Sequence, residues 1–202
     1  MNLKEIKKAA YKAIVENKQS HQSFFDEHVD KVEIGRVQFA EEISKIPSKS
    51  KMEKHQAWII TYIILMLVII ILRSIALPLL FSQLPTPVLL LLLVIGIIVP
   101  VFAIYSALKA KVDFYKAVAI LMGVNLLRSF TKGQFSGEIS DFIGLAPVLI
   151  VIVLAFYIPQ LLKSKYTETV VQEEVDGVVK KVIKIEFEKE VIKDDKLLDS
   201  KI

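Results

Sequence analysis

Cysteine is absent from the 202 residues of this chain. Without cysteine the chain forms no disulfide, no thiolate metal site and no cysteine nucleophile. A glycine-rich phosphate loop, a nucleophile elbow and a zinc-protease motif are also missing from the sequence. His21 and His28 fall on one helical face, but no third ligand accompanies them, so we expect ordinary surface histidines. These absences predict a protein that is not an enzyme and that holds no metal or cofactor.

Charge is scarce in the middle of the chain, although 24% of all residues are charged and 53% are hydrophobic. Most charges lie in residues 1–54 and 163–202, and none occurs between Arg73 and Lys109. A helix rises 1.5 Å per residue, so roughly 20 apolar residues cross a ~30 Å hydrocarbon layer. We therefore predict a transmembrane domain over residues 57–162, with spans at 57–81, 88–108, 112–130 and 142–162.

The fold class that follows is an all-α membrane protein, a four-transmembrane-helix bundle with polar ends. Residues 112–130 form the shortest apolar run and contain Asn125 and Arg128, so a re-entrant or interfacial helix is the alternative there. The first apolar run starts only at Ala57, which favours an uncleaved anchor over a signal peptide. Trp58 and Tyr62, near the start of that run, are expected at the level of the lipid headgroups.

Lysine and arginine near the ends of the spans predict the topology. Lysines flank the first span, the 109–116 loop and the last span, whereas the two opposite loops hold none and two basic residues. Because basic residues stay on the cytoplasmic side, we expect both termini in the cytoplasm and the protein in the inner membrane. The net charge of +4 and the pI near 9.1 are explained by these lysines, so no nucleic-acid partner is expected.

Residues 1–50 show three helical patterns that predict a small cytosolic helical region. The first covers residues 2–17, where Ile6, Ala10 and Ile14 share a face that we expect to pack on the following helices rather than on a membrane surface. The second is capped by Ser20 or Ser23, and the third ends at Pro47 with a break at Gly35. A unit this small buries little core alone, so it should lean on another element.

Residues 163–202 predict a cytosolic β-hairpin followed by a charged tail. Two strand-like runs, 166–175 and 178–187, flank Asp176 and Gly177, a pair typical of a type I′ turn. In that register Val175 opposes Val178, Glu173 opposes Lys180 and Val171 opposes Val182. Because an isolated hairpin is marginally stable, we expect it to dock on the N-terminal helices or to pair with another chain.

Polar and small residues within the spans are the candidate functional positions. Arg73 and Arg128 either snorkel to headgroups or face the bundle interior, pairing there with Glu138 or Asp141. Asn125 is expected to join two helices or to line a pore. No acidic residue lies deep in a span, which argues against a proton or sodium relay. The predicted helix-packing positions are Gly96, Pro100, Ala103, Ala107, Ala119 and Gly123.

Two functions are compatible with this pattern. The first is an integral membrane interaction or sensing subunit that presents its cytosolic module to a protein partner. The alternative is a small homo-oligomeric channel or pore-forming membrane protein, in which Arg73 or Arg128 would repeat as a ring around an axis. In both cases the expected partners are the lipid bilayer and either further copies of the chain or another protein.

Overall fold

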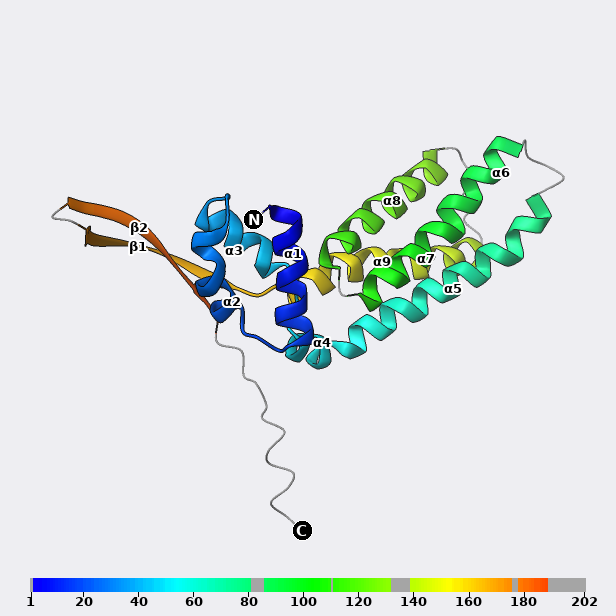
Figure 1. Cartoon of the computed structure of the whole chain (residues 1–202). Coiled ribbons are helices and arrows are strands. Elements are labelled where there is room, and N and C mark those ends of the chain that lie inside the picture. The colour runs from blue at the N-terminus through cyan, green and yellow to red at the C-terminus, as the bar shows by residue number, and fades with distance from the viewer. Residues whose placement is uncertain (1, 81–85, 110, 132–138, 176–177, 189–202) are drawn as a thin grey trace, which may run out of the picture. The chain divides into compact units, whose positions relative to one another are not determined.

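The computed structural model describes residues 2–80, 86–109, 111–131, 139–175 and 178–188 (Figure 1). The chain divides into two compact units. The terminal unit comprises Met1–Lys54 together with Leu162–Ile202, and the apolar unit comprises His55–Leu161. The two ends of the chain therefore belong to one unit, although the whole apolar unit separates them in sequence.

The N-terminal part of the terminal unit is a series of short helices: α1 (Leu3–Tyr11), η1 (Lys12–Glu16), α2 (His21–His28), η2 (Val29–Lys31), α3 (Arg36–Ser44) and α4 (Lys49–Lys54). Asn2 begins α1 with a capping box that includes Glu5. Ser20 begins α2, because its side chain accepts a hydrogen bond from the backbone N–H of Ser23. Gly35 is the N-cap of α3, which places the predicted break at the start of that helix.

The C-terminal part of the terminal unit is an antiparallel hairpin of β1 (Tyr166–Val175) and β2 (Val178–Phe187). Val175 pairs with Val178, Glu173 with Lys180 and Val171 with Val182, which confirms the predicted register. Asp176 and Gly177 lie outside the described residues. The two-residue turn and the predicted cross-strand pairs therefore gave the correct pairing over the full length of both strands.

One hydrophobic core joins the N-terminal helices to the hairpin. Its buried members are Ile6, Ala10, Ile14, Phe24, Phe25, Phe39, Ala40, Ile43, Ile185 and Phe187. The ring of Phe187 lies 5.9 Å from that of Phe25 and 5.5 Å from that of Tyr166, measured between centroids. The hairpin thus docks on the N-terminal helices, one of the two outcomes expected from the sequence. The apolar face of the first helix also packs inward, as predicted.

The apolar unit consists of α5 (Gln56–Leu80), α6 (Thr86–Leu93), η3 (Val94–Ile98), α7 (Val99–Leu108), α8 (Val112–Thr131) and α9 (Ile139–Leu162). These helices coincide closely with the four apolar runs of the sequence. Two helices in the described part are long and apolar enough to cross a membrane, at Gln56–Ile75 and Gly144–Leu162, and Gly96–Leu108 is a shorter apolar helix. Within this unit α7 packs against both α5 and α8 (Figure 1).

The second apolar run is not one regular helix. A π-helical turn, η3, separates α6 from α7 directly before Pro100. Proline has no backbone N–H, so Pro100 cannot make the α-helical bond to the carbonyl of Gly96, and a widened turn accommodates this gap. Pro147 and Pro159 lie inside α9, which continues through both positions.

Candidate functional site

The hairpin extends away from the core with regularly arranged backbone groups along its outer edge. Glu188 donates its backbone N–H to the carbonyl of Lys165 at 3.0 Å, which fixes the phase of the ladder. Hydrogen-bonded and non-hydrogen-bonded pairs alternate in an antiparallel ladder. The N–H and C=O groups of Phe187, Ile185 and Ile183 therefore point away from β1.

The side-chain amide of Gln22, on α2, occupies the first part of this edge. Its Nε2 donates to the carbonyl of Ile185 at 3.3 Å, and its Oε1 accepts from the N–H of Phe187 at 2.8 Å. Nε2 also donates to Asp26 Oδ1 at 2.8 Å, which orients the amide. Gln22 therefore makes the pair of bonds that a neighbouring strand would make, and it closes the β2 edge at its base.

Beyond Gln22 the hairpin carries apolar side chains that nothing in the described part of the chain covers. Val170 and Ile183 are cross-strand partners on the same face as buried Ile185, and they are 67% and 39% exposed. Val171 is exposed on the opposite face. On β2 these residues alternate with Lys181 and Lys184, both exposed. The hairpin thus presents an apolar and basic edge strand to solvent.

A buried polar cluster ties the start of the hairpin to the N-terminal helices. His21 is only 2% exposed, so the expectation of a surface histidine was wrong. Its Nε2 lies 2.7 Å from the Ile46 carbonyl, and its Nδ1 lies 3.4 Å from Ser164 Oγ. Since a carbonyl only accepts hydrogen bonds, Nε2 carries the proton. The physical reason for the burial is that α2 turns this face toward the core, where Phe187 stacks on the imidazole at 5.6 Å.

Ser164 is the other centre of this cluster. Its N–H donates to the Ser44 carbonyl at 2.9 Å, and Lys51 Nζ donates both to Ser164 Oγ and to the Lys163 carbonyl, each at 3.2 Å. Ser164 is itself buried, which closes the serine and histidine pair to any substrate. The arrangement therefore fastens the chain between α9 and β1 to α3 and α4.

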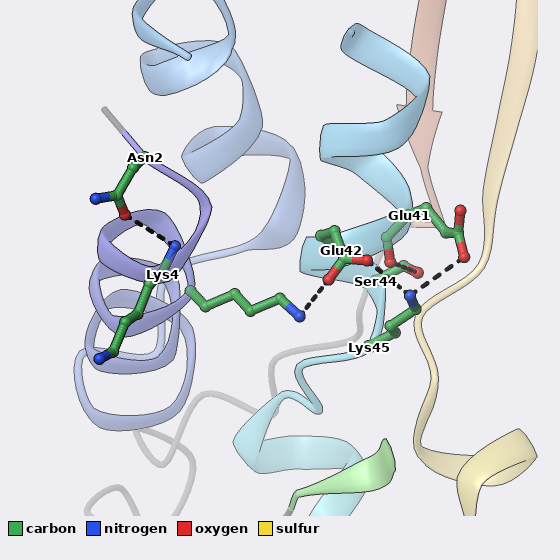
Figure 2. Close-up of polar contacts among 7 residues, drawn as sticks. Asn2, Lys4, Glu41, Glu42, Ser44 and Lys45 are labelled. Atoms are coloured by element: carbon green, nitrogen blue, oxygen red, sulfur yellow. Dashed lines mark hydrogen bonds and ion pairs between the residues drawn. The ribbon is translucent and has the colours of Figure 1, made fainter. Parts of the chain in front are cut away.

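A carboxylate links α1 to α3 at the surface of the terminal unit. Glu42 accepts from Lys45 Nζ at 2.8 Å and forms an ion pair with Lys7 of α1 (Figure 2). Burial raises the pKa of Glu42, but the hydrogen bonds from Lys45 and Lys7 outweigh that effect and leave the pKa below its ordinary value. The hydrogen bond with Glu42 correspondingly raises the pKa of Lys45. Glu42 therefore stays ionised and joins the two helices.

In the apolar unit, Arg73 lies against one of the predicted packing positions. A Cβ at Gly96 would stand 3.5 Å from Arg73 Cγ, so the stem of this exposed arginine covers the glycine. Pro100, Ala103 and Ala107 are buried on α7. Ala119 is buried on α8, whereas a Cβ at Gly123 would meet no heavy atom within 4 Å. A close approach at Gly123 to another subunit stays a prediction.

The remaining predicted positions lie on α8 or among residues whose side chains are not described. Asn125 is half-buried and Arg128 is exposed on α8. Glu138, one of the two acidic residues expected to pair with an arginine, lies outside the described residues, as does the side chain of Asp141, the other. The proposed pairing with Arg73 or Arg128 therefore stays a prediction.

Three buried hydroxyls were missed by the sequence analysis. Tyr62 on α5, Ser106 on α7 and Tyr115 on α8 have no hydrogen-bond partner within the described residues. The rings of Tyr62 and Tyr115 lie 5.0 Å apart, so Tyr62 packs into the unit, and its expected position at headgroup level stays a prediction. Trp58, one turn earlier, is exposed and contacts Tyr157 edge-on. The position of Tyr115 within the helical period of Val112, Ala119 and Met122 is the signal that predicts inward packing.

No group of three or more histidine, aspartate or glutamate side chains that could hold a metal ion occurs in the described part of the chain. Comparison with known proteins gave no match: no family model, no curated protein and no solved structure is similar to this chain.

Proposed function

We propose that this protein is an integral membrane protein with four crossings, whose two ends form one cytosolic module that binds a protein partner. The observation that carries the proposal is the shared core of the terminal unit. Phe25 and Phe39 precede the apolar unit in sequence, and Phe187 follows it, yet all three belong to one core. Two ends that fold together must lie on the same side of a membrane, so an inserted apolar unit crosses it an even number of times.

The outer surface of the apolar unit supports insertion into lipid. Only 17% of the apolar stretch Gln56–Ile75 of α5 is buried within the chain. A core helix of a soluble protein would be mostly buried, whereas apolar residues on α5, α7, α8 and α9 face outward: Ile64, Ile71, Phe102, Leu108, Val124, Leu127, Val153 and Phe156. Exposed apolar side chains in this number are typical of contact with lipid or with another protein.

The even number of crossings also bears on α8. With α5, the α6 to α7 segment and α9 each crossing once, a re-entrant α8 would leave three crossings and place the two ends on opposite sides. A crossing α8 restores four, in agreement with the distribution of lysines. α8 has 20 residues, about the length needed to span the hydrocarbon layer. We therefore favour a full crossing over the re-entrant alternative.

The proposed partner-binding role rests on the hairpin. Its strands have ten residues each, and among the described side chains those that pack on the helices lie at the end near Phe187 and Tyr166. Exposed apolar strand edges are sites where other chains bind. A pore formed by several copies, with Arg73 or Arg128 lining it, stays the alternative, and single-channel recording of the purified protein in planar bilayers tests it.

Single-cysteine labelling tests the topology, and the natural absence of cysteine makes every introduced cysteine unique. We expect cysteine at Lys12, Lys109 or Thr167 to react with an impermeant maleimide only after the membrane is opened. Cysteine at Ser82 or Ser136 should react in intact cells. Thr167 is preferred to Ser164, because Ser164 is buried. Labelling of Lys12 and Thr167 from opposite sides would refute the proposal, and labelling of Ser136 and Lys109 from the same side would refute the crossing by α8.

A further inference from the structure

We propose that the outer edge of β2 beyond Gln22 binds an extended acidic segment of a partner protein, which adds to the hairpin as a third strand. This inference rests on the proposed partner-binding function of the terminal unit and names the chemistry of the partner. It is carried by the backbone geometry of the edge, by the amide that already occupies its base, and by the charges beside it.

The backbone supplies the first part of the argument. The ladder that places the groups of Ile185 and Phe187 on the outer edge places those of Ile183, Lys181 and Val179 there as well, because the alternation continues along the strand. Gln22 shows that an amide takes up ladder bonds at this edge, at 3.3 Å and 2.8 Å. Its side chain is too short to reach further, so a peptide in the same position would continue from Ile183 onward.

The side chains of β2 determine which segment fits. Lys181 and Lys184 are exposed on opposite faces of β2, and Lys180 belongs to the same strand. Lys184 pairs with Glu186 of its own strand at 2.9 Å, and both side chains are largely exposed. In the hairpin Lys181 opposes Gln172 and Lys184 opposes Thr169, so β1 places no carboxylate directly opposite either lysine. A segment of acidic and β-branched residues added at the outer edge would supply carboxylates beside them.

A second copy of the chain does not fit this edge. Two β2 strands side by side would bring together two strands that each carry three lysines and one glutamate, so the positive charges would repel each other. If β1 of a second copy were added antiparallel to β2, it would lie two strand spacings, about 10 Å, from β1 of the first copy. The helical cores of the two copies would then be separated by no more than the diameter of one helix. The helices α1 to α3 packed at the hairpin base need more room than that. A partner that contributes only an extended segment avoids both conflicts.

The test uses the full-length protein in nanodiscs of neutral lipid and a fluorescent, N-acetylated peptide with the sequence of residues 166–175, YTETVVQEEV. We expect saturable binding by fluorescence anisotropy, and no binding of a control peptide in which lysine replaces each glutamate. Lys181→Glu combined with Lys184→Glu should weaken binding of the acidic peptide about tenfold, because two exposed positive charges that attract the glutamates of the peptide become negative. The same variant should gain affinity for the control peptide.

A matched pair of proline variants assigns the edge. Val170 and Ile183 oppose each other, and the N–H of each points away from the ladder. Ile183→Pro therefore removes a donor of the β2 edge without removing a ladder bond, and Val170→Pro does the same for the β1 edge. We expect Ile183→Pro to abolish peptide binding and Val170→Pro to retain it. Fast hydrogen exchange of the amides of Thr167 and Glu186, which face the inner ladder, would identify a proline variant whose hairpin has opened. In that case the lysine-to-glutamate variants decide whether the β2 edge binds the peptide.

Three results would overturn the inference: absence of saturable binding, loss of binding in Val170→Pro with retention in Ile183→Pro, or self-association of the protein that the two lysine reversals abolish. The last result would identify a second copy as the occupant. None of these results alters the topology, which the cysteine labelling decides independently. Opposite-side labelling of Lys12 and Thr167 would refute the proposed function and leave peptide binding to be interpreted as a property of the hairpin alone.

Discussion

Replacing Phe187 by alanine tests whether the two ends of the chain share one core. Phe187 is 8% exposed, and its ring contacts those of His21, Phe25 and Tyr166. Phenylalanine to alanine changes in cores cost about 3–5 kcal/mol, through lost transfer free energy and the cavity that remains. Since Phe187 lies at the margin of the core, we expect a loss near the lower limit, about 3 kcal/mol, in the free energy of unfolding of the terminal unit.

Hydrogen exchange measured by mass spectrometry resolves this effect by segment. A loss of about 3 kcal/mol corresponds to exchange roughly 100-fold faster for amides that exchange through unfolding of the whole unit. We expect this increase in α1, α2 and α3, which lie more than a hundred residues before the substitution. The lone tryptophan, Trp58, belongs to the apolar unit and is a poor reporter of this unfolding.

Ile183→Ala provides the matched control, because Ile183 lies on the same strand and the same face but is largely exposed. It should change the free energy of unfolding, measured by hydrogen exchange in the helices, by less than about 1 kcal/mol, as is usual for exposed positions. If Phe187→Ala accelerates exchange only in β1 and β2 and leaves α1 to α3 unchanged, the hairpin is a peripheral element. The shared core, and with it the argument for an even number of crossings, would then be refuted.

Three further substitutions follow from individual contacts. Glu42→Gln should lower the stability of the terminal unit by about 1–2 kcal/mol at pH 7. The pKa of Glu42 is lowered in the folded state, so its contribution to stability is present above the ordinary value of 4.5 and is lost as the pH falls through the folded pKa. The variant and the parent should therefore reach the same stability in acid, as measured by exchange rates corrected for pH. Lys18 has φ 57°, a backbone conformation that glycine adopts more easily than other residues. Lys18→Gly should therefore stabilise the terminal unit by about 0.5–1 kcal/mol, whereas Lys18→Ala should not. Equal effects of the two variants would contradict this explanation. Ala107→Leu should destabilise the apolar unit by about 1–3 kcal/mol by overpacking α7, in contrast to exposed Val101→Leu, as followed by Trp58 fluorescence on heating in detergent.

Features encoded by local sequence were predictable. The helices of the apolar unit match the apolar runs, because hydropathy along the chain is sufficient to locate helices of this length. The hairpin register was also predictable, because the Asp176 and Gly177 pair and the valine and opposite-charge pairs across the strands specify the same pairing. Both signals need only neighbouring residues.

Features that depend on distant residues were not predictable. His21 is buried because Ile46, Ser164 and Phe187 surround it, and none of these lies near it in sequence. The same holds for Gln22, which resembles a surface residue by type but makes strand-like bonds to β2. Tyr62 has an apolar ring and a polar tip, which suit a membrane surface, but its contact with Tyr115 turns it inward. In each case tertiary packing decided between positions that the local sequence left equivalent.

The shared core also constrains the order in which the protein assembles. α1 to α3 are synthesised first, but their core is incomplete until Ile185 and Phe187, near the other end of the chain, arrive to cover it. A region of this size buries too little apolar surface to be stable alone, so it gains its full stability only after the apolar unit has been made. If that unit inserts as it is synthesised, the two ends of the chain meet only after all crossings have been completed and their number is even. The folded terminal unit is then a structural consequence of correct insertion, and the proposed partner-binding edge forms only on a correctly inserted chain.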